Sequence, residues 1–405
     1  MDTRKLTRAQ LQQAIEKNKN VLTEHFDLDY AKALNKHAIG WLTKYYFRAQ
    51  FIGFDELPER NNPDFPLIFA SNHSGMAFPW DGIIFLSGLF DKWDYLHNAP
   101  RPLTAPMLSQ STLMNPFLIR NLWKRVGSID ATTLNFETLM QYSDYNLMIY
   151  PEGVPGIGKG FNNKYKLQRL STSMVRMSLK YKTDIILISS VNGEYINPGH
   201  YSNNWVNRII QKIGIPFLPL GWLTLILLLQ PWLFYYGLPA KLTFVMGSRI
   251  KPHEWTNKPF EEMERKDLEE LRDKIHGIMQ TDLDKAVRDY GKNPYQWKEH
   301  FKTLFTNWKK MPFLLPWAWP LLFSEFQRKY TKYGNGNFEM KLGFWSFFRI
   351  LFRNPFIFAY FIPILGWIPV LLKGYKNAQF NKKNKGAKID KKERHASENL
   401  HEQNT

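Results

Sequence analysis

The chain has 405 residues, enough for a full mixed core with further segments attached to it. Its 54 Lys and Arg exceed its 36 Asp and Glu, and the resulting net charge of +18 favours anionic partners such as nucleic acid, acidic lipid headgroups or phosphate-bearing substrates. The absence of cysteine excludes disulfides, thiolate nucleophiles and cysteine-ligated metals.

The N-terminal segment, residues 1–44, shows helical spacing of its apolar residues and predicts an amphipathic helical arm. Its first residues are polar, with no apolar run of signal-peptide type, so we expect the catalytic part to remain at the cytoplasmic face of the cell membrane.

Residues 45–290 alternate between strand and helix patterns, which predicts an α/β domain with a mostly parallel layered sheet flanked by helices. The predicted strands are 45–53, 66–70, 126–129, 146–150, 184–191 and 241–247. The predicted helices are 82–89, 133–141, 169–181 and 260–290.

An apolar run at 213–238 interrupts this domain and is long enough to span a bilayer. The strand that follows it should rejoin the same sheet, and a single crossing would leave that strand on the far side. We therefore expect the run to dip into the membrane or to lie flat, and the alternative is a buried core segment.

The last part of the chain differs in composition from the α/β domain. Residues 291–372 combine basic and aromatic residues, a pattern typical of a membrane interface rather than a base-stacking surface for nucleic acid. A straight helix over 355–372 would be about 27 Å long and contains two internal prolines, which favours a hairpin or in-plane segment. Residues 373–405 predict a basic, disordered tail. The expected attachment is peripheral or monotopic.

Two residues with catalytic potential follow the predicted strand 66–70, namely His73 and Asp81. A neutral imidazole oriented by a carboxylate on its other nitrogen can deprotonate an alcohol. Asp81 stands near the start of the next helix, shortly after Pro79. The alternative is that His73 is a turn residue and that Asp81 complements the helix dipole.

A second candidate element follows the strand 146–150 and is dense in glycine. Such a loop can present backbone N–H groups to an anion, with Lys159 adding a positive charge. It is not a nucleotide-binding P-loop, because Gly160 follows the Gly-Lys pair where Ser or Thr is required. By itself, a loop of this kind is most often a turn.

Together the two elements, about eighty residues apart, resemble the lysophospholipid/glycerol acyltransferase superfamily, in particular a bacterial branch similar to 1-acylglycerol-3-phosphate acyltransferases. The resemblance runs from about residue 33 to 252 and includes the segments 49–58, 164–169 and 186–194. It implies a membrane-bound enzyme that transfers a fatty acyl group from a coenzyme A or acyl carrier protein thioester to a (lyso)glycerolipid hydroxyl. The thioester is a co-substrate, and no cofactor is implied.

The resemblance also implies residue roles. His73 would be the general base and Asp81 its orienting partner. The expected substrate-binding residues are Asn72, Ser74, Gly75, Pro151, Glu152, Gly153, Gly156, Gly158, Lys159 and Arg169.

The chain departs from the family pattern at three points. Seven residues separate His73 from Asp81, where the family has four. The glycine-plus-arginine block of the family reads here as residues 127–131 without the arginine, and Pro155 replaces the arginine expected after Glu-Gly. Each lost arginine removes a charged hydrogen bond to phosphate, about 1.5–3 kcal/mol. A neutral acceptor, such as diacylglycerol or a long-chain alcohol, is therefore an alternative.

Other functions have less support in the sequence. A non-catalytic lipid-binding protein on a degenerate acyltransferase fold is an alternative from a different class, and nucleic-acid binding is suggested by charge alone. No His-Glu-x-x-His or EF-hand pattern occurs, so we predict no metal site. Ser74 lies outside any Gly-x-Ser-x-Gly elbow, which disfavours a serine hydrolase.

Overall fold

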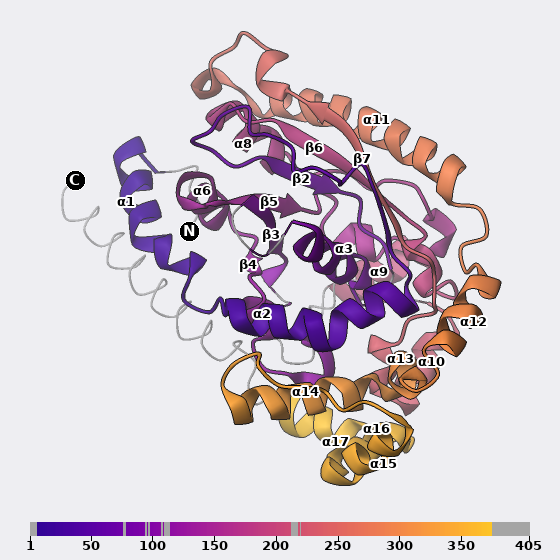
Figure 1. The fold of residues 1–405 in the computed structure, drawn as a ribbon. Coiled ribbons are helices and arrows are strands. Elements are labelled where there is room, and N and C mark those ends of the chain that lie inside the picture. Colours follow the sequence, from indigo (N-terminus) through magenta and orange to yellow (C-terminus); the bar gives the residue numbers. More distant parts are fainter. Residues whose placement is uncertain are drawn as a thin grey trace.

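The computed structural model describes residues 6–374 except 76–77, 94, 96–97, 107, 109–113, 212–217 and 219. A seven-stranded mixed sheet lies at its centre, in the order β1-β7-β6-β2-β5-β3-β4 (Figure 1). Neighbouring strands are parallel except for the antiparallel pair β6 and β7. The strands are β1 Gln50–Ile52, β2 Ile68–Ser71, β3 Asn98–Thr104, β4 Ile129–Asp130, β5 Tyr145–Ile149, β6 Ile185–Val191 and β7 Thr243–Ile250. This confirms the predicted mostly parallel α/β architecture.

Helices surround the sheet and continue beyond it towards the C-terminus (Figure 1). In the part of the chain described, they are α1 Arg8–Asn18, α2 Leu28–Leu34, α3 Trp80–Lys92, α5 Leu122–Arg125, α6 Thr133–Tyr142, α7 Val154–Ile157, α8 Ser173–Tyr181, α9 Asn204–Gln211, α10 Trp222–Leu229, α11 Arg265–Tyr290, α12 Trp297–Thr306, α13 Met311–Leu314, α14 Trp319–Tyr333, α15 Phe344–Arg353, α16 Phe358–Phe361 and α17 Trp367–Pro369.

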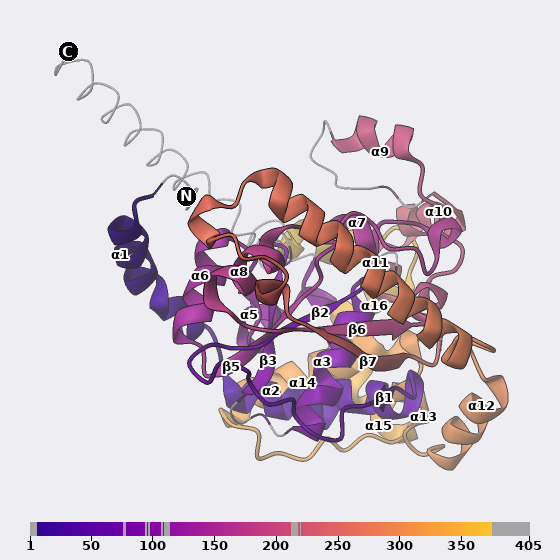
Figure 2. The ribbon, with the colours of Figure 1, turned by 90° about the horizontal axis from the view of Figure 1, so that it is seen from above.

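Both faces of the sheet are buried, because successive side chains of a strand point to opposite faces. In β2, Ile68 and Ala70 belong to one apolar cluster with residues of α6, α8 and α11. Phe69 belongs to the other, with residues of α2, α3 and α14. Figure 2 shows α8 and α11 on one side of the sheet and α2 and α14 on the other. The molecule is thus a three-layer α/β structure.

Three local predictions were wrong. The predicted strand 126–129 shares only residue 129 with β4, because the chain turns at 126–127 after α5. The segment predicted as a strand over 45–53 forms a strand only at Gln50–Ile52, and Leu42–Tyr46 is a π-helical turn that continues the N-terminal helices. Strand β3 was missed because Pro100 and Pro102 argue against a strand inside a sheet. The chain tolerates them there with a shift in register between Asn98 and Arg101.

Both ends of the described chain pack on the main core. Tyr30, Leu34 and Leu42 from the N-terminal helices are fully buried, as are Phe313 and Trp319 near the C-terminus. The ring of Trp319 lies 4.9 Å from that of Trp80 on α3. These segments therefore share the core of the α/β domain, whose sequence boundaries stay a prediction.

The apolar run at 213–238 contains α10 and the turn Pro231–Tyr235, with residues 213–217 and 219 outside the described residues. The strand after it, β7, pairs with both β1 and β6, so the prediction that the chain rejoins the sheet is confirmed. None of the described helices is both long and apolar enough to cross a membrane.

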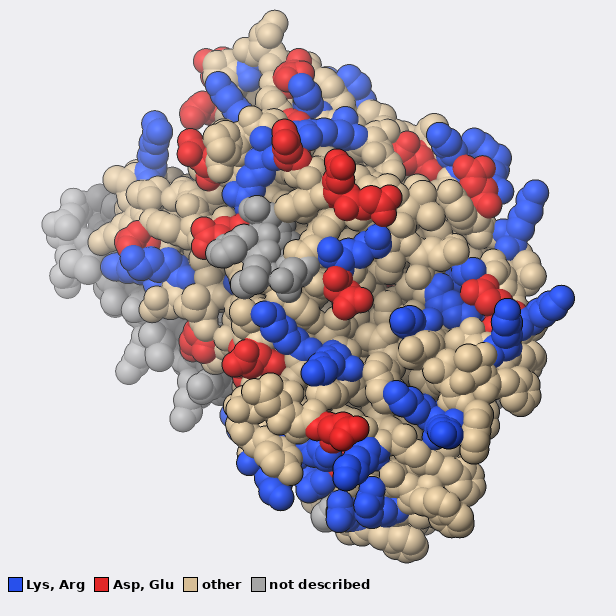
Figure 3. Space-filling model, in the orientation of Figure 1, with Lys and Arg blue, Asp and Glu red and all other residues tan. Residues whose placement is uncertain are grey.

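The predicted basic tail lies outside the described residues from 375 onwards. On the face drawn in Figure 3, Lys and Arg outnumber Asp and Glu.

Candidate active site

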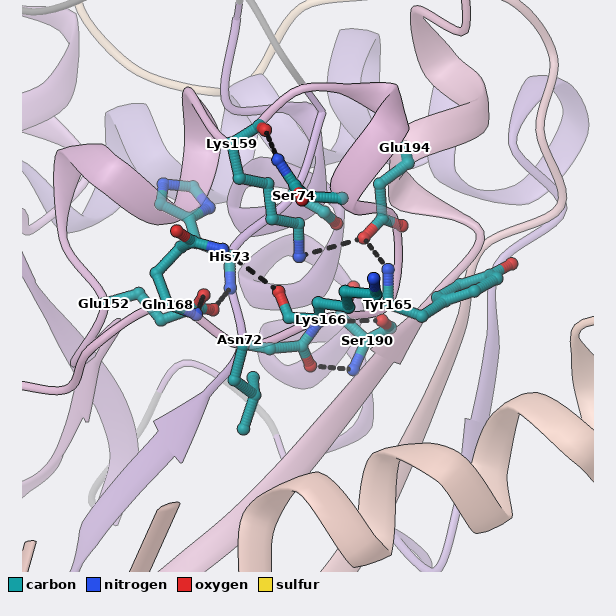
Figure 4. A network of polar contacts seen from close by, with 12 residues as sticks. Asn72, His73, Ser74, Glu152, Lys159, Tyr165, Lys166, Gln168, Ser190 and Glu194 are labelled. Carbon is teal, nitrogen blue, oxygen red and sulfur yellow. Dashed lines mark hydrogen bonds and ion pairs between the residues drawn. The ribbon is translucent and has the colours of Figure 1, made fainter. Parts of the chain in front are cut away.

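The candidate site lies where three adjacent parallel strands end. β2 is hydrogen-bonded to β5 on one side and to β6 on the other, so their carboxyl ends lie at the same edge of the sheet. His73 follows β2, Glu152 follows β5 and Glu194 follows β6. In open α/β sheets this edge is where ligands bind. Figure 4 shows the polar network that these loops form.

His73 and Asp81 are in direct contact. The Nδ1 atom of His73 lies 2.8 Å from Oδ2 of Asp81, and the same oxygen accepts a hydrogen bond of 2.8 Å from the backbone N–H of Ser74. The Asp81 side chain is fully buried and that of His73 is 13% exposed. The expectation that Asp81 reaches the imidazole is confirmed, although seven residues separate the two.

The start of α3 explains how the longer spacing still permits this contact. Pro79 precedes the helix and Asp81 occupies its first turn, so the loop after β2 folds back over the helix N-terminus. The indole Nε1 of Trp80 donates a hydrogen bond of 3.0 Å to the carbonyl of Tyr235, which anchors this helix end in the core. Asp81 is thus held on a rigid element.

Tyr150 packs against His73 and was not among the predicted site residues. The two ring centroids are 4.3 Å apart with an angle of 30° between the planes. Burial, together with the charge of Asp81, holds the pKa of Tyr150 well above its ordinary value, so the phenol stays neutral. The signal that could have found it is its place directly before Pro-Glu-Gly at the end of β5.

Glu152 holds the histidine loop in place. Its Oε1 accepts a 2.9 Å hydrogen bond from the backbone N–H of His73, and its Oε2 accepts one of 2.6 Å from the backbone N–H of Gln168. Burial raises the pKa of this carboxyl, against the opposing effects of Lys159 and the two N–H donors. These contacts position the histidine loop, and the predicted contact of Glu152 with substrate stays a prediction.

Lys159 is paired within the protein. Its Nζ lies 3.0 Å from Oε1 of Glu194, and both side chains are fully buried. Burial lowers the pKa of Lys159, but the charges of Glu194 and Glu152 outweigh this effect and the pKa lies above its ordinary value. We expected Lys159 to add a positive charge to an anion-binding loop. In the structure, its ammonium forms an ion pair with the Glu194 carboxylate instead. Glu194 was overlooked as a site residue, although it ends the segment 186–194 that carries part of the family resemblance.

The residues beside His73 connect the loop to its neighbours. Asn72 exchanges two hydrogen bonds with the backbone of Ser190 on β6, of 3.0 and 2.7 Å. The carbonyl of Gly75 accepts one of 2.9 Å from Asn197. These contacts fix the loop conformation in which His73 meets Asp81.

The glycine-rich loop packs tightly against the histidine. A Cβ on Gly156 would lie 3.0 Å from the Cβ of His73 and 2.7 Å from that of Glu152, so a side chain there would displace the site. Gly153 has a φ of +60°, which favours glycine. Gly158 ends the short helix α7, and the carbonyl of Pro151 accepts a 2.8 Å hydrogen bond from Ser171.

Arg169 is not brought together with the other predicted residues. Its side chain is 67% exposed, and its guanidinium lies 3.0 Å from the Glu269 carboxylate on α11. Two cations on α5 also have acidic partners: Arg125 lies 2.8 Å from Asp27, and Lys124 lies 4.0 Å from Asp130.

No model of a known protein family matches the chain, and no solved structure matches it significantly. An uncharacterized protein of Mycobacterium bovis and another of Mycobacterium tuberculosis are each 25% identical to the chain over 222 residues, 53% of this chain and 58% of theirs. An uncharacterized protein of Mycobacterium leprae is 25% identical over 226 residues, 54% of this chain and 58% of its own length. The chain thus spans little more than half the length of these curated relatives, and the similarity assigns no family.

Proposed function

We propose that the chain is an O-acyltransferase that moves a fatty acyl group from a coenzyme A or acyl carrier protein thioester to the hydroxyl of a (lyso)glycerolipid. The observation that carries the proposal is the 2.8 Å contact between Nδ1 of His73 and the buried Asp81 carboxylate at the carboxyl end of β2. The family resemblance of the motifs around both residues supports it.

The chemistry requires a base that removes a hydroxyl proton as the oxygen attacks the thioester carbonyl. A carboxylate accepts hydrogen bonds, so Asp81 favours the tautomer in which Nδ1 of His73 carries the proton and Nε2 holds a lone pair. Nε2 takes the proton of the lipid hydroxyl while the oxygen forms its bond to the carbonyl carbon. The tetrahedral intermediate then breaks its carbon–sulfur bond, and His73 returns the proton to the leaving thiolate.

The surroundings of His73 suit this role. The ring is packed by Tyr150 on one face and its backbone is held by Glu152, so few orientations are open to it. A base held in this way contributes roughly 10²–10⁴-fold to the rate. The partial exposure of His73 leaves the imidazole open to a substrate.

The test is transfer of a radiolabelled acyl group from acyl-coenzyme A, or from acyl carrier protein, to lipid acceptors. His73→Ala should abolish transfer and leave the circular dichroism spectrum unchanged. His276→Ala, on α11 on the other side of the sheet, is the matched control and should retain activity. Near-full activity of His73→Ala would contradict the role of His73 as the base. A folded wild-type protein that binds lipid but transfers no acyl group from either donor would favour the non-catalytic lipid-binding alternative.

A neutral acceptor is the second version of this function. Three cations at or near the motifs are already compensated, since Lys159 is paired with Glu194, Arg125 with Asp27 and Arg169 with Glu269. A phosphate-bearing acceptor would have to compete with these carboxylates. A panel of lysophosphatidic acid, diacylglycerol and a long-chain alcohol distinguishes the versions, and a clear preference for lysophosphatidic acid would count against the neutral acceptor.

A further inference from the structure

A second feature of the molecule is an exposed apolar surface built from segments far apart in the sequence. Helix α10, with the sequence WLTLILLL, is apolar on all sides. Leu225 and Leu228 on it are 68% and 64% exposed. A helix that is apolar all round belongs in a protein core or in lipid, and α10 is only partly covered in the described part of the protein.

The segment 355–372 lies directly against α10. The backbone N–H of Ile364 donates a 2.6 Å hydrogen bond to the carbonyl of Leu229, and the indole of Trp367 donates one of 2.7 Å to the carbonyl of Leu228. On this segment Ile364 is 65% exposed and Leu371 is 60% exposed. Two apolar runs separated by more than a hundred residues therefore form adjoining parts of one surface.

Helix α15 extends this surface. Its Ile350 is buried, whereas Trp345 and Phe352 are 81% and 73% exposed. The ring centroid of Phe352 lies 6.3 Å from that of Phe358, which joins α15 to the segment 355–372. We call the exposed apolar residues of α10, 355–372 and α15 the apolar face. Its elements gather at the lower right of Figure 1.

The two sequence stretches that contain the apolar face carry no acidic residue. No Asp or Glu occurs in the sequence from 195 to 253 or from 340 to 389, the two stretches that build the face. Exposed Arg349 and Arg353 flank the aromatic residues on α15. Exposed aromatic and aliphatic side chains beside cations suit the headgroup region of an anionic bilayer, where the rings enter the interface and the cations bind lipid phosphates.

The apolar face is connected to the candidate active site. The ring of Trp222 on α10 stacks near His200, with the centroids 6.2 Å apart. The carbonyl of His200 accepts a 2.7 Å hydrogen bond from Phe161 at the end of the glycine-rich loop, and Asn197 holds Gly75 beside His73. A bilayer bound at α10 would therefore lie close to the loops that surround the base.

We propose that the apolar face docks the protein on one leaflet of an anionic membrane, without crossing it, and that the site draws its lipid acceptor from that leaflet. The docking stands on the face itself, and only the source of the acceptor rests on the proposed function. The N-terminal and α11 sides of the molecule remain in water.

The experiment measures co-sedimentation of the full chain with vesicles of phosphatidylcholine, with and without phosphatidylglycerol. Two double variants remove exposed apolar groups from separate parts of the face: Trp345→Ser with Phe352→Ser on α15, and Leu225→Ser with Leu228→Ser on α10. Each should weaken binding to the phosphatidylglycerol vesicles about tenfold or more. Tyr333→Ser, which changes a half-exposed aromatic residue at the far end of α14, is the control and should bind like the wild type.

The outcomes separate docking from catalysis and from self-association. His73→Ala should bind vesicles like the wild type, so loss of activity and loss of docking are independent results. Binding of the wild type should increase with phosphatidylglycerol and fall in high salt. The proposal is overturned if both double variants bind as the wild type does, or if only one part of the face matters. It is also overturned if light scattering shows that the substitutions break a dimer while vesicle binding is unchanged.

Discussion

The candidate active site buries polar side chains, whereas the apolar face exposes apolar ones. In the site, buried charged side chains lie against internal partners, as with Asp81 and His73 or Lys159 and Glu194. On the apolar face, large apolar side chains such as Trp345 are exposed without cover in the described structure. Buried polar groups need partners because their desolvation is costly, whereas exposed apolar groups favour a covering surface because contact between apolar area and water is unfavourable. These charges of the site are therefore compensated within the chain, whereas the large apolar side chains of the face remain exposed.

The largest effect expected within the site follows from replacing the partner of the base. Asp81→Asn preserves the shape of the side chain but removes the charge that orients His73, so transfer should fall on the order of 10²–10⁴-fold. Steady-state acyl transfer at saturating donor measures it. Asp91→Asn, on the exposed end of the same helix, is the matched control. Equal activity of Asp81→Asn and the wild type would show that the contact is structural only, and vesicle binding should be the same for both.

The next effect concerns the buried ion pair. Glu194→Gln keeps an acceptor for the backbone N–H of Tyr165, 3.0 Å away, but leaves the Lys159 ammonium buried without its counter-charge. Breaking such a pair should lower the free energy of unfolding by about 3–5 kcal/mol. Urea unfolding followed by circular dichroism measures it. Glu254→Gln, at a carboxylate that is 56% exposed, should change little. An unchanged urea midpoint for Glu194→Gln would mean that the pair does not stabilise the loops.

The smallest effect tests the connection between the two regions. Burial lowers the pKa of His200 from 6.5 to about 4, despite an opposing hydrogen bond to the carbonyl of Asn197. Between these values the unfolded chain takes up a proton that the folded chain excludes, so the contribution of neutral His200 is present above pH 6.5 and is lost as pH falls to about 4. The loss should be at most about 3 kcal/mol.

The measurement is urea unfolding at pH 7 and at pH 4.5. His200→Gln should show a smaller decline in the free energy of unfolding over this interval than the wild type. His25→Gln changes a partly exposed histidine far from α10 and should decline as the wild type does. If the free energy of unfolding falls equally in all three proteins between pH 7 and pH 4.5, protonation of His200 does not weaken the packing beside α10.

The strand patterns predicted much of the site. The sequence placed His73 and Glu152 each after a predicted strand of a mostly parallel sheet, and the structure shows that these strands, β2 and β5, are parallel neighbours that end at the same edge. Partners within the loops were not predictable in this way. The sequence contains many acids that Lys159 could reach, and only the turn after β6 brings Glu194 to 3.0 Å from it. The same holds for Tyr150, whose ring meets His73 because of how β5 ends.

The sequence by itself determined the α/β class, the place of His73 after a strand and the apolar character of the two runs 213–238 and 355–372, because strand periodicity, strand ends and hydropathy are local properties. The tertiary structure decided which groups are neighbours. It placed Asp81 on His73 across seven intervening residues and compensated Lys159 internally. It also joined α10 to the segment 355–372 into one face, because contacts between distant segments depend on how the whole chain packs and not on any window of sequence.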